Sequence, residues 1–220
     1  MTSRNNNDLL SEQFLSLSEE EKALIMGTLL GDAHLQKRGN SYRLKITHGS
    51  DQYSYVTWKH TKLKRFCTTT QAPKLDTDQK GYQTVTFYTS SGKWLTEIYN
   101  LFYLKKDDES RPSKSITQKL IDSLPMHPMV LAVWFMDDGS VRDDCYAGKL
   151  ATQGFTKEES QLLCEYLKKW GIEGKVVAHS VSKNQYYISL PASTFGKFVS
   201  EIRAIVNEIG TPPVLKCLIN

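Results

Sequence analysis

The chain contains two copies of one sequence pattern, and this duplication restricts the possible folds more than any other feature. An apolar stretch ends at Asp32, and a second apolar stretch ends at Asp138, 106 residues further on. Downstream of these, residues 83–103 are similar to residues 185–206. The corresponding segments occur in the same order and at nearly constant spacing. The sequence therefore predicts a duplicated chain in which two halves share one fold.

Each copy shows helical and strand patterns in the order helix, strand, strand, helix, strand, strand, helix. Paired strands between helices predict an α+β fold, a pseudo-twofold duplication of αββαββα halves with one antiparallel sheet in each. The expected segments are 18–32, 34–38, 42–47, 51–66, 74–76, 82–89 and 93–104 in the first half, and 128–138, 141–142, 149–153, 156–170, 175–180, 185–190 and 195–209 in the second. We assign residues 1–17 to an N-terminal extension, 18–104 to the first half, 105–123 to a polar linker and 124–220 to the second half.

Both apolar helices are expected to end in aspartate, although a helix C-terminus carries partial negative charge and favours Lys or Arg by about 0.3–1 kcal/mol. A turn explains one such aspartate, because Asp and Gly are ordinary turn residues. Two at matching positions favour a cation that neutralises both. Gly27 and Gly31 leave a bare strip on the first helix, so that the second helix can approach and bring Asp32 next to Asp138. Paired carboxylates of this kind can hold Mg²⁺ and support phosphodiester hydrolysis.

The composition is compatible with a polyanionic partner but does not require one. The chain has 28 Lys and Arg against 24 Asp and Glu, a formal net charge of +4. Its four cysteines are scattered, without the spacing of a zinc site or the density of a disulfide framework, which favours a reducing compartment. No segment is long and apolar enough to span a membrane, and Met1–Asp8 lacks the apolar core of a signal peptide. We therefore expect an intracellular protein that is not secreted.

Both apolar stretches resemble the signature motif of the LAGLIDADG homing endonucleases. IMGTLLGDA at residues 25–33 and LAVWFMDDG at residues 131–139 occupy the frame of the motif, and each keeps the acidic residue at the eighth position. The run WFMDDG and the downstream LATQGFT at residues 150–156 are similar to the single-chain, two-motif members encoded in introns. The resemblance extends over nearly the whole chain, from Ser18 to Leu218.

The resemblance implies a site-specific, metal-dependent endonuclease that cuts both strands of a long asymmetric DNA target, in an organelle or in bacterial or phage cytoplasm. The two motif helices would form the interface between the halves. Asp32 and Asp138 would share two or three Mg²⁺ ions, with backbone atoms of Gly31 and Asp137 as further candidate ligands. The cofactor implied is therefore magnesium, held between the halves.

Two further pairs of residues match active-site positions of the family. Lys114 and Lys216 match its active-site lysines, which can stabilise developing negative charge or polarise the attacking water. Gln153 matches a position that helps to order active-site solvent, and His48 is its counterpart in the first half. A solvated lysine and a polar residue at the end of a sheet are the ordinary alternatives for these positions.

Three motif positions depart from the family pattern. Ala33 takes the place of a glycine, and Val133 makes the close approach of the two helices asymmetric. Asp137 occupies a position where the family often has a small residue, which leaves open whether it competes for metal.

In this family each half lays a curved antiparallel sheet into the major groove of DNA, and the expected strands suit this use. Polar side chains able to reach bases or phosphates alternate with apolar ones, although a solvated sheet face is the alternative for each residue taken singly. A fused pair of diverged halves needs neither a palindrome nor a second copy, so we expect a monomer. The helix at 51–66 adds a basic run that could contact phosphates or simply be solvated, namely Lys59, His60, Lys62, Lys64 and Arg65. The expected DNA-binding residues are Gln36, Arg38, Arg43, Lys45 and Thr47 in the first half and Arg142, Lys149, His179, Lys183 and Gln185 in the second.

Two other functions stay open from the sequence. The family includes intron maturases, which use the same fold on intron RNA with or without cleavage of DNA. A cleavage-inactive DNA-binding regulator on this scaffold is the other. Both motif aspartates and both matching lysines are present, which favours cleavage but does not exclude a second role.

Overall fold

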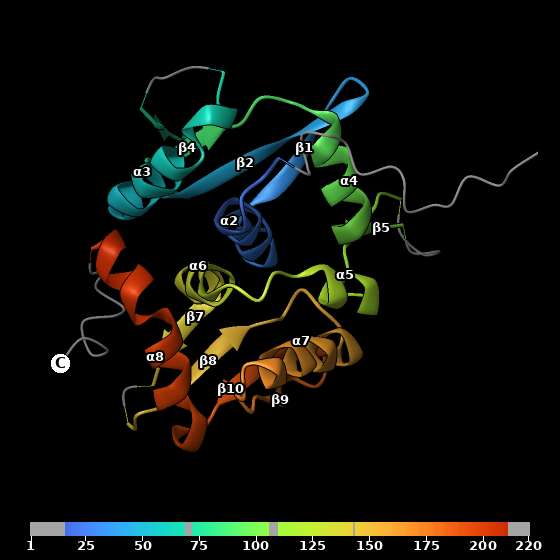
Figure 1. The fold of residues 1–220 in the computed structure, drawn as a ribbon, viewed down its shortest axis with the longest axis vertical. Coiled ribbons are helices and arrows are strands. Elements are labelled where there is room, and N and C mark those ends of the chain that lie inside the picture. Colours follow the sequence, from blue (N-terminus) through green and yellow to red (C-terminus); the bar gives the residue numbers. More distant parts are fainter. Residues whose placement is uncertain (1–15, 69–71, 106–109, 143, 211–220) are drawn as a thin grey trace, which may run out of the picture.

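The computed structural model describes residues 16–68, 72–105, 110–142 and 144–210, which form two similar halves on either side of a central pair of helices (Figure 1). The first half has a four-stranded antiparallel sheet with the strand order β1-β2-β4-β3. Two short 3₁₀ helices, η1 and η2, flank its second helix. Its elements are α2 (Glu19–Leu30), β1 (His34–Arg38), β2 (Ser41–Gly49), η1 (Ser50–Gln52), α3 (Tyr53–Lys62), η2 (Lys64–Phe66), β3 (Lys74–Thr77), β4 (Gln83–Tyr88) and α4 (Lys93–Phe102).

The second half repeats this arrangement, and its sheet has the equivalent strand order β7-β8-β10-β9. The prediction of an α+β duplication with one antiparallel sheet in each half is therefore confirmed. The elements of the second half are α6 (Pro128–Asp138), β7 (Gly139–Val141), β8 (Gly148–Ala151), α7 (Lys157–Lys169), β9 (Lys175–Ser180), β10 (Gln185–Leu190) and α8 (Ala192–Ile209).

The segment between the halves has a structure of its own. The strand β5 (Tyr103–Leu104) pairs with β6 (Ser113–Lys114), and the helix α5 (Gln118–Ser123) follows. The expected linker at 105–123 therefore includes a strand that places Lys114 and a short helix, and its boundaries stay a prediction. Lys216, the predicted partner of Lys114, lies outside the described residues.

Local sequence explains where the two central helices begin. Ser18 and Glu21 form a capping box at the start of α2: Ser18 Oγ accepts the N–H of Glu21 at 3.1 Å, and the Glu21 carboxylate accepts that of Ser18 at 2.8 Å. Pro128 begins α6, where its missing N–H leaves no helical hydrogen bond unmade. All residues from Ala23 to Leu30 and from Met129 to Phe135 are buried, so each helix is surrounded by protein on all faces.

The helices α2 and α6 lie side by side in the middle of the molecule, between the two sheets (Figure 1). Gly27 allows this approach, because a Cβ atom at position 27 would lie 2.9 Å from both the Cα atom and the carbonyl oxygen of Val130. The side chain of Val133 would be closer still. Gly27 therefore faces valines of α6, and the close approach is asymmetric.

Each sheet turns an apolar face towards the helices. Along β2, the side chains of Leu44, Ile46 and His48 are buried, while Arg43 and Lys45 alternate with them on the other face. The helices α3 and α4 pack against β2 from the buried side. Among the described helices, none has both the length and the apolar character needed to cross a membrane.

Candidate active site at the ends of the central helices

Asp32 and Asp138 lie where the two central helices end. Asp138 is the last residue of α6, and α2 ends two residues before Asp32. Gly31 brings these ends together, because a Cβ atom at position 31 would lie 2.5 Å from the Cβ atom of Asp137. The end of each motif helix therefore contributes carboxylates to one place between the halves.

The carboxylates at this junction repel one another electrostatically. Burial, followed by the charges of Asp32 and Asp137, raises the pKa of Asp138 to about 7, although Lys114 and Lys59 lower it. Burial and Asp137 also raise the pKa of Asp32, whose side chain is 45% exposed. Such a conflict is expected where carboxylates gather at two negative helix ends, and a divalent cation would relieve it. The donor set therefore fits a bound divalent ion.

Lys114 reaches the same junction from β6. Its Nζ donates a hydrogen bond to the backbone oxygen of Gly31 at 2.7 Å. Burial lowers the pKa of Lys114 to about 8, while the charges of Asp138 and two further aspartates, Asp137 and Asp32, raise it. The lysine expected at the first motif thus lies beside it, and the position of Lys216 stays a prediction.

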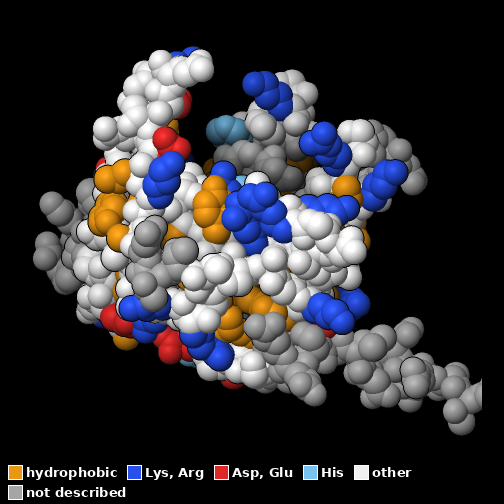
Figure 2. Space-filling model, turned by 90° about the horizontal axis from the view of Figure 1, so that it is seen from above, with side chains coloured by type: hydrophobic (Ala, Val, Ile, Leu, Met, Phe, Trp, Pro, Cys, Tyr) orange, Lys and Arg blue, Asp and Glu red, His pale blue; other side chains and the backbone are white. Residues whose placement is uncertain are grey.

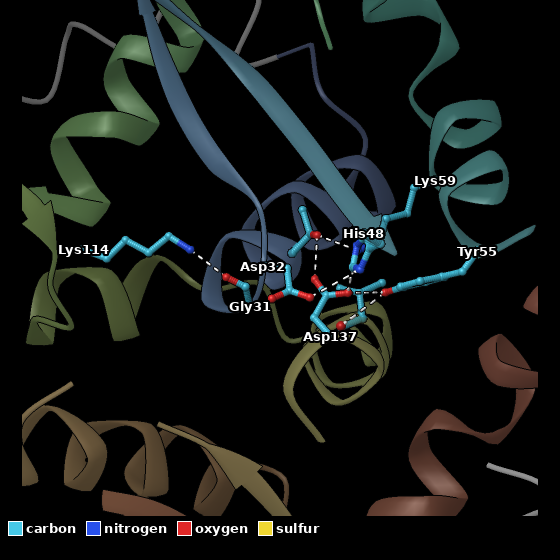
Figure 3. A network of polar contacts seen from close by, with 9 residues as sticks. Gly31, Asp32, His48, Tyr55, Lys59, Lys114 and Asp137 are labelled. Carbon is cyan, nitrogen blue, oxygen red and sulfur yellow. Dashed lines mark hydrogen bonds and ion pairs between the residues drawn. The ribbon is translucent and has the colours of Figure 1, made fainter. Parts of the chain in front are cut away.

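His48 extends from the buried face of β2 towards Asp32 (Figure 3). Its Nδ1 lies 3.3 Å from Asp32 Oδ2, and 5% of the residue is exposed. Burial, followed by the charge of Lys59, lowers the pKa of His48 to about 4, so the imidazole is neutral near pH 7. A neutral imidazole next to Asp32 can orient a water molecule or bind a metal ion.

Asp137, whose role its sequence leaves open, is buried in the interface between the halves. Its Oδ1 accepts hydrogen bonds from Lys59 Nζ at 2.7 Å and from the Tyr55 hydroxyl at 2.8 Å, and its Oδ2 accepts one from Thr28 Oγ1 at 2.8 Å. All three donors belong to the first half. Asp137 therefore links α6 to both α2 and α3.

The expectation that Lys59 contacts phosphate or is solvated is wrong, because the side chains of Lys59 and Asp137 are both 0% exposed. The spacing of residues along α3 indicates that Lys59 is buried. Tyr55, Val56 and His60 are buried on α3, so position 59 lies on the apolar stripe of the helix, where a lysine requires a partner. Recognising which partner requires the structure.

A second group of potential metal ligands overlaps the predicted pair. Ligand atoms of Asp32, His48 and Asp137 all lie within 4.8 Å of one another. However, Lys59 and Tyr55 already bind Asp137 Oδ1. The pair formed by Asp32 and Asp138 is therefore the stronger candidate for holding metal.

The outer face of the first sheet carries a connected set of polar side chains. Arg43 donates to Gln36 Oε1 from Nε at 2.9 Å and from Nη2 at 2.7 Å, and its guanidinium carbon lies 3.8 Å from the centre of the Tyr88 ring. The hydroxyls of Thr47 and Thr86 are 2.8 Å apart on the same face. Figure 2 shows Lys and Arg side chains spread over this side of the molecule, with few Asp and Glu among them in the middle of that face. Of the remaining predicted residues, Lys45 points outward from β2 and Arg38 ends β1.

The outer face of the second sheet forms a hollow. It is lined by Arg142, Lys149, Gln153 and His179, all of them predicted site residues, together with Asp144. Asp144 binds Arg142 through two hydrogen bonds of 2.8 and 2.6 Å. Of the last two predicted residues, Gln185 begins β10 and Lys183 lies in the exposed turn before it. The structure thus gathers Arg142, Lys149, Gln153 and His179 around one hollow, and the contact of all these residues with DNA stays a prediction.

Sequence comparisons place this chain beside known endonucleases and a maturase. The model of the LAGLIDADG DNA endonuclease family matches residues 22–198. The DNA endonuclease I-ChuI of Chlamydomonas applanata is 25% identical over 201 residues, which cover 86% of this chain and 91% of that protein. The cytochrome b mRNA maturase bI2 of Saccharomyces cerevisiae is 25% identical over 177 residues, which cover 76% of this chain and 40% of the maturase.

Structural comparisons extend this likeness to nearly the whole chain. The homing endonuclease I-WcaI bound to its DNA recognition sequence has a TM-score of 0.70 at 21% identity, covering 99% of this chain and 95% of that one. Mesophilic variants of the homing endonuclease I-DmoI have a TM-score of 0.55 at 12% identity, covering 84% and 96%. At sequence identities of 21% and 12%, these structural similarities show that the fold is shared.

Proposed function

Because this chain belongs to the LAGLIDADG DNA endonuclease family, we propose that it is a site-specific double-strand DNA endonuclease that depends on divalent cations held by Asp32 and Asp138. The observation that carries this proposal is the meeting of both aspartates at two packed helix ends, with the pKa of Asp138 raised to about 7. This arrangement costs stability until a cation binds. Oxygen ligands suit Mg²⁺, and we propose two or three such ions shared between the aspartates.

The chain supplies distinct groups for phosphodiester hydrolysis. Bound cations would polarise the scissile phosphodiester and make water a better nucleophile. The ammonium group of Lys114, anchored on the Gly31 carbonyl, can stabilise the negative charge that develops on the phosphate. The neutral imidazole of His48 can orient water beside Asp32. We assign the matching roles in the second half to Gln153 and Lys216.

We propose that the outer faces of the two sheets bind the DNA in successive major grooves. The hydrogen-bonded pair of Gln36 and Arg43 and the hollow around Lys149 offer groups for base edges and phosphates. The solved relative I-WcaI is bound to its DNA recognition sequence, which supports this assignment. Since the two faces carry different residues, the target should be long and asymmetric, and one copy of the chain should suffice.

The proposal is tested by incubating the protein with Mg²⁺ and a library of long duplex DNA, and by sequencing the new ends. Asp32→Asn and Asp138→Asn are compared with Asp122→Asn, which changes an exposed aspartate of α5. We expect one asymmetric site to be cut on both strands, with cleavage reduced at least ~10³-fold by either site variant and unchanged by the control. Folded protein that binds DNA without metal-dependent cleavage would contradict the proposal and favour a cleavage-inactive regulator.

An RNA-binding maturase is the second candidate, and the similarity to the cytochrome b mRNA maturase favours it. Binding to duplex DNA and to a structured intron RNA should be measured for the same preparation. Splicing should then be assayed with Asp32→Asn and Asp138→Asn. RNA binding and splicing that survive loss of both aspartates would establish a role separate from cleavage.

We also propose a reducing intracellular compartment for the protein, in an organelle or in bacterial or phage cytoplasm. Cys67, Cys145 and Cys164 are free thiols, and burial raises the pKa of Cys67 to about 11. Free cysteines are typical of reducing compartments. Loss of activity in oxidising buffer, reversed by a thiol reductant, would support this assignment.

A further inference from the structure

Lys59 and Asp137 form a buried ion pair beside Asp32 and His48 (Figure 3). We propose that the Lys59 ammonium is a built-in cation of the active site, which holds Asp137 in the interface so that the second motif offers only Asp138 to metal. This inference rests on the proposed metal site at Asp32 and Asp138. Lys59 is a positioning residue in this scheme, because it acts through Asp137.

The second motif ends in two adjacent aspartates, and the structure sends their side chains to different surroundings. Neighbouring residues of an α-helix point about 100° apart. Asp137 fits the space that Gly31 leaves on α2: a Cβ atom at position 31 would lie 2.9 Å from Asp137 Oδ2. Asp138 instead interacts electrostatically with Asp32 and Lys114. Asp137 is therefore the carboxylate that packs against the end of the first helix.

The surroundings of Lys59 have the composition of a metal site. Its Nζ lies 2.7 Å from Asp137 Oδ1, 2.7 Å from Thr28 Oγ1 and 3.4 Å from His48 Nε2. An ammonium group has three hydrogens to offer, and here it is surrounded by a carboxylate, a hydroxyl and an imidazole. The Tyr55 ring closes the remaining side, with its centre 4.2 Å from Nζ. The ammonium thus sits where a metal ion would otherwise find ligands.

Without the ammonium, two of its neighbours, His48 and Asp137, would be free to bind a metal ion together with Asp32. Asp32, His48 and Asp137 already bring ligand atoms within 4.8 Å of one another. Their combination of two carboxylates and one imidazole suits Mn²⁺ better than Mg²⁺ or Ca²⁺, which prefer oxygen ligands alone. Removal of the Lys59 charge should therefore convert the interface into an additional Mn²⁺ site.

Lys114, the other lysine near the ends of the central helices, has a different role from Lys59. Lys114 approaches the Gly31 carbonyl from one side, whereas Lys59 and Tyr55 enter from the opposite side (Figure 3). Lys114 is half-buried, but the Lys59 side chain is fully enclosed and is bound to the other half of the chain. Lys114 can reach a substrate phosphate, while Lys59 acts on the carboxylates alone, through its ion pair with Asp137 and through its charge.

The test is to count Mn²⁺ ions per protein, in the absence of DNA, by electron paramagnetic resonance titration. We expect Lys59→Met to bind one Mn²⁺ ion more than the unaltered protein, and Lys59→Met/Asp137→Asn to lose that ion again. Lys62→Met is the matched control, because Lys62 lies on the same helix and pairs with Glu20 at 2.7 Å and with Glu208 at 2.8 Å. An unchanged count and affinity in Lys59→Met would overturn the proposal.

A second measurement decides the question if Lys59→Met does not fold without metal. Mn²⁺ should then restore its cooperative thermal unfolding, whereas Lys59→Met/Asp137→Asn should fold without added metal. Failure of Mn²⁺ to restore folding would overturn the proposal equally. An unaltered protein that binds no Mn²⁺ would contradict the proposed metal site at Asp32 and Asp138, and a gained ion in Lys59→Met would still establish the role of Lys59.

Discussion

The two halves share a strand order but differ in the polar residues that they bury. In the first half, His48 on β2 and Lys59 on α3 are buried and turned towards the ends of the central helices. In the second half, α7 instead buries Glu159, whose carboxylate accepts the N–H groups of Ile116 at 3.2 Å and Thr156 at 2.7 Å. The duplication is thus close to symmetrical in its backbone, but the buried cation of the site comes from one half.

The DNA-facing surfaces differ in a second way. The hairpin strands β1 and β2 have five and nine residues, whereas β7 and β8 have three and four. Arg43 of the first sheet binds the neutral side chain of Gln36, while Arg142 of the second binds the carboxylate of Asp144. Arg43 therefore keeps a positive charge that its partner does not neutralise, and we expect the first half to contribute more of the electrostatic attraction to DNA.

The largest expected effect tests the close contact between the two central helices, where Gly27 on α2 faces Val130 on α6. Gly27→Leu should lower the free energy of unfolding by about 3 kcal/mol or more, because the new side chain meets the backbone of Val130 and the close packing of α2 on α6 is lost. Urea denaturation measures this change. Gly154→Ala is the control, since no atom of the described part of the chain lies within 4 Å of a Cβ atom at position 154, and its free energy of unfolding should change by no more than about 0.5 kcal/mol. Equal destabilisation by both would show that the helix contact is not needed.

The next effect compares the two solvent-ordering positions. His48→Ala should reduce the cleavage rate by about 10²-fold, because it removes the neutral imidazole beside Asp32 and leaves Lys59 without one neighbour. Gln153→Ala should reduce it less, since Gln153 lines an open hollow of the second sheet. Single-turnover cleavage of a labelled target, read separately for each strand, provides the measurement. A larger loss of cleavage rate in Gln153→Ala than in His48→Ala would show that the second half contributes more to solvent ordering than the first.

The third expected effect is a difference of about 1 kcal/mol in the stabilisation by Ca²⁺ between two pH values. It distinguishes Asp138 from Asp32 by the raised pKa of Asp138. The pKa of Asp138 is raised to about 7 in the fold, so without metal its contribution to stability is present at low pH and is lost as the pH rises through 7. Ca²⁺ should therefore raise the melting temperature more at pH 8 than at pH 6. Thermal unfolding with and without Ca²⁺ tests this, and Asp138→Asn should remove most of the difference. A Ca²⁺ effect that is independent of pH would place the ion elsewhere.

The elements that follow from the sequence are those set by local patterns. Strands were expected at 175–180 and 185–190, and β9 and β10 have these bounds, because alternation and a tight turn define them. The expected strand at 149–153 ends at Ala151 instead. The reason lies in a distant contact, since Thr152 is buried and donates to the carbonyl oxygen of Tyr186 at 3.1 Å.

The candidate site likewise has parts that follow from local sequence motifs and parts that depend on contacts between distant residues. Asp32, Asp138 and Lys114 stand in recognisable motifs, and the structure brings them to one junction. The pairing of Lys59 with Asp137 joins residues 78 positions apart, and it depends on which faces of α3 and α6 meet across the interface. A sequence pattern predicts that a buried lysine needs a partner, but the partner is fixed by packing between the halves.

The smallest effect tests the difference between the two DNA-facing sheets. Asp144→Asn should tighten binding to DNA by a few-fold and make the dependence on salt steeper by about one unit in the log–log slope, because it frees Arg142 for a phosphate. Arg43→Ala should make that slope shallower by a similar amount, since Arg43 binds the neutral Gln36 and no carboxylate of the described residues pairs with it. Fluorescence anisotropy on one duplex at several salt concentrations measures both. If Asp144→Asn leaves the slope unchanged while Arg43→Ala alters it, the second sheet contacts the DNA through Lys149 and its neighbours, and the two halves differ in which residues bind and not only in charge.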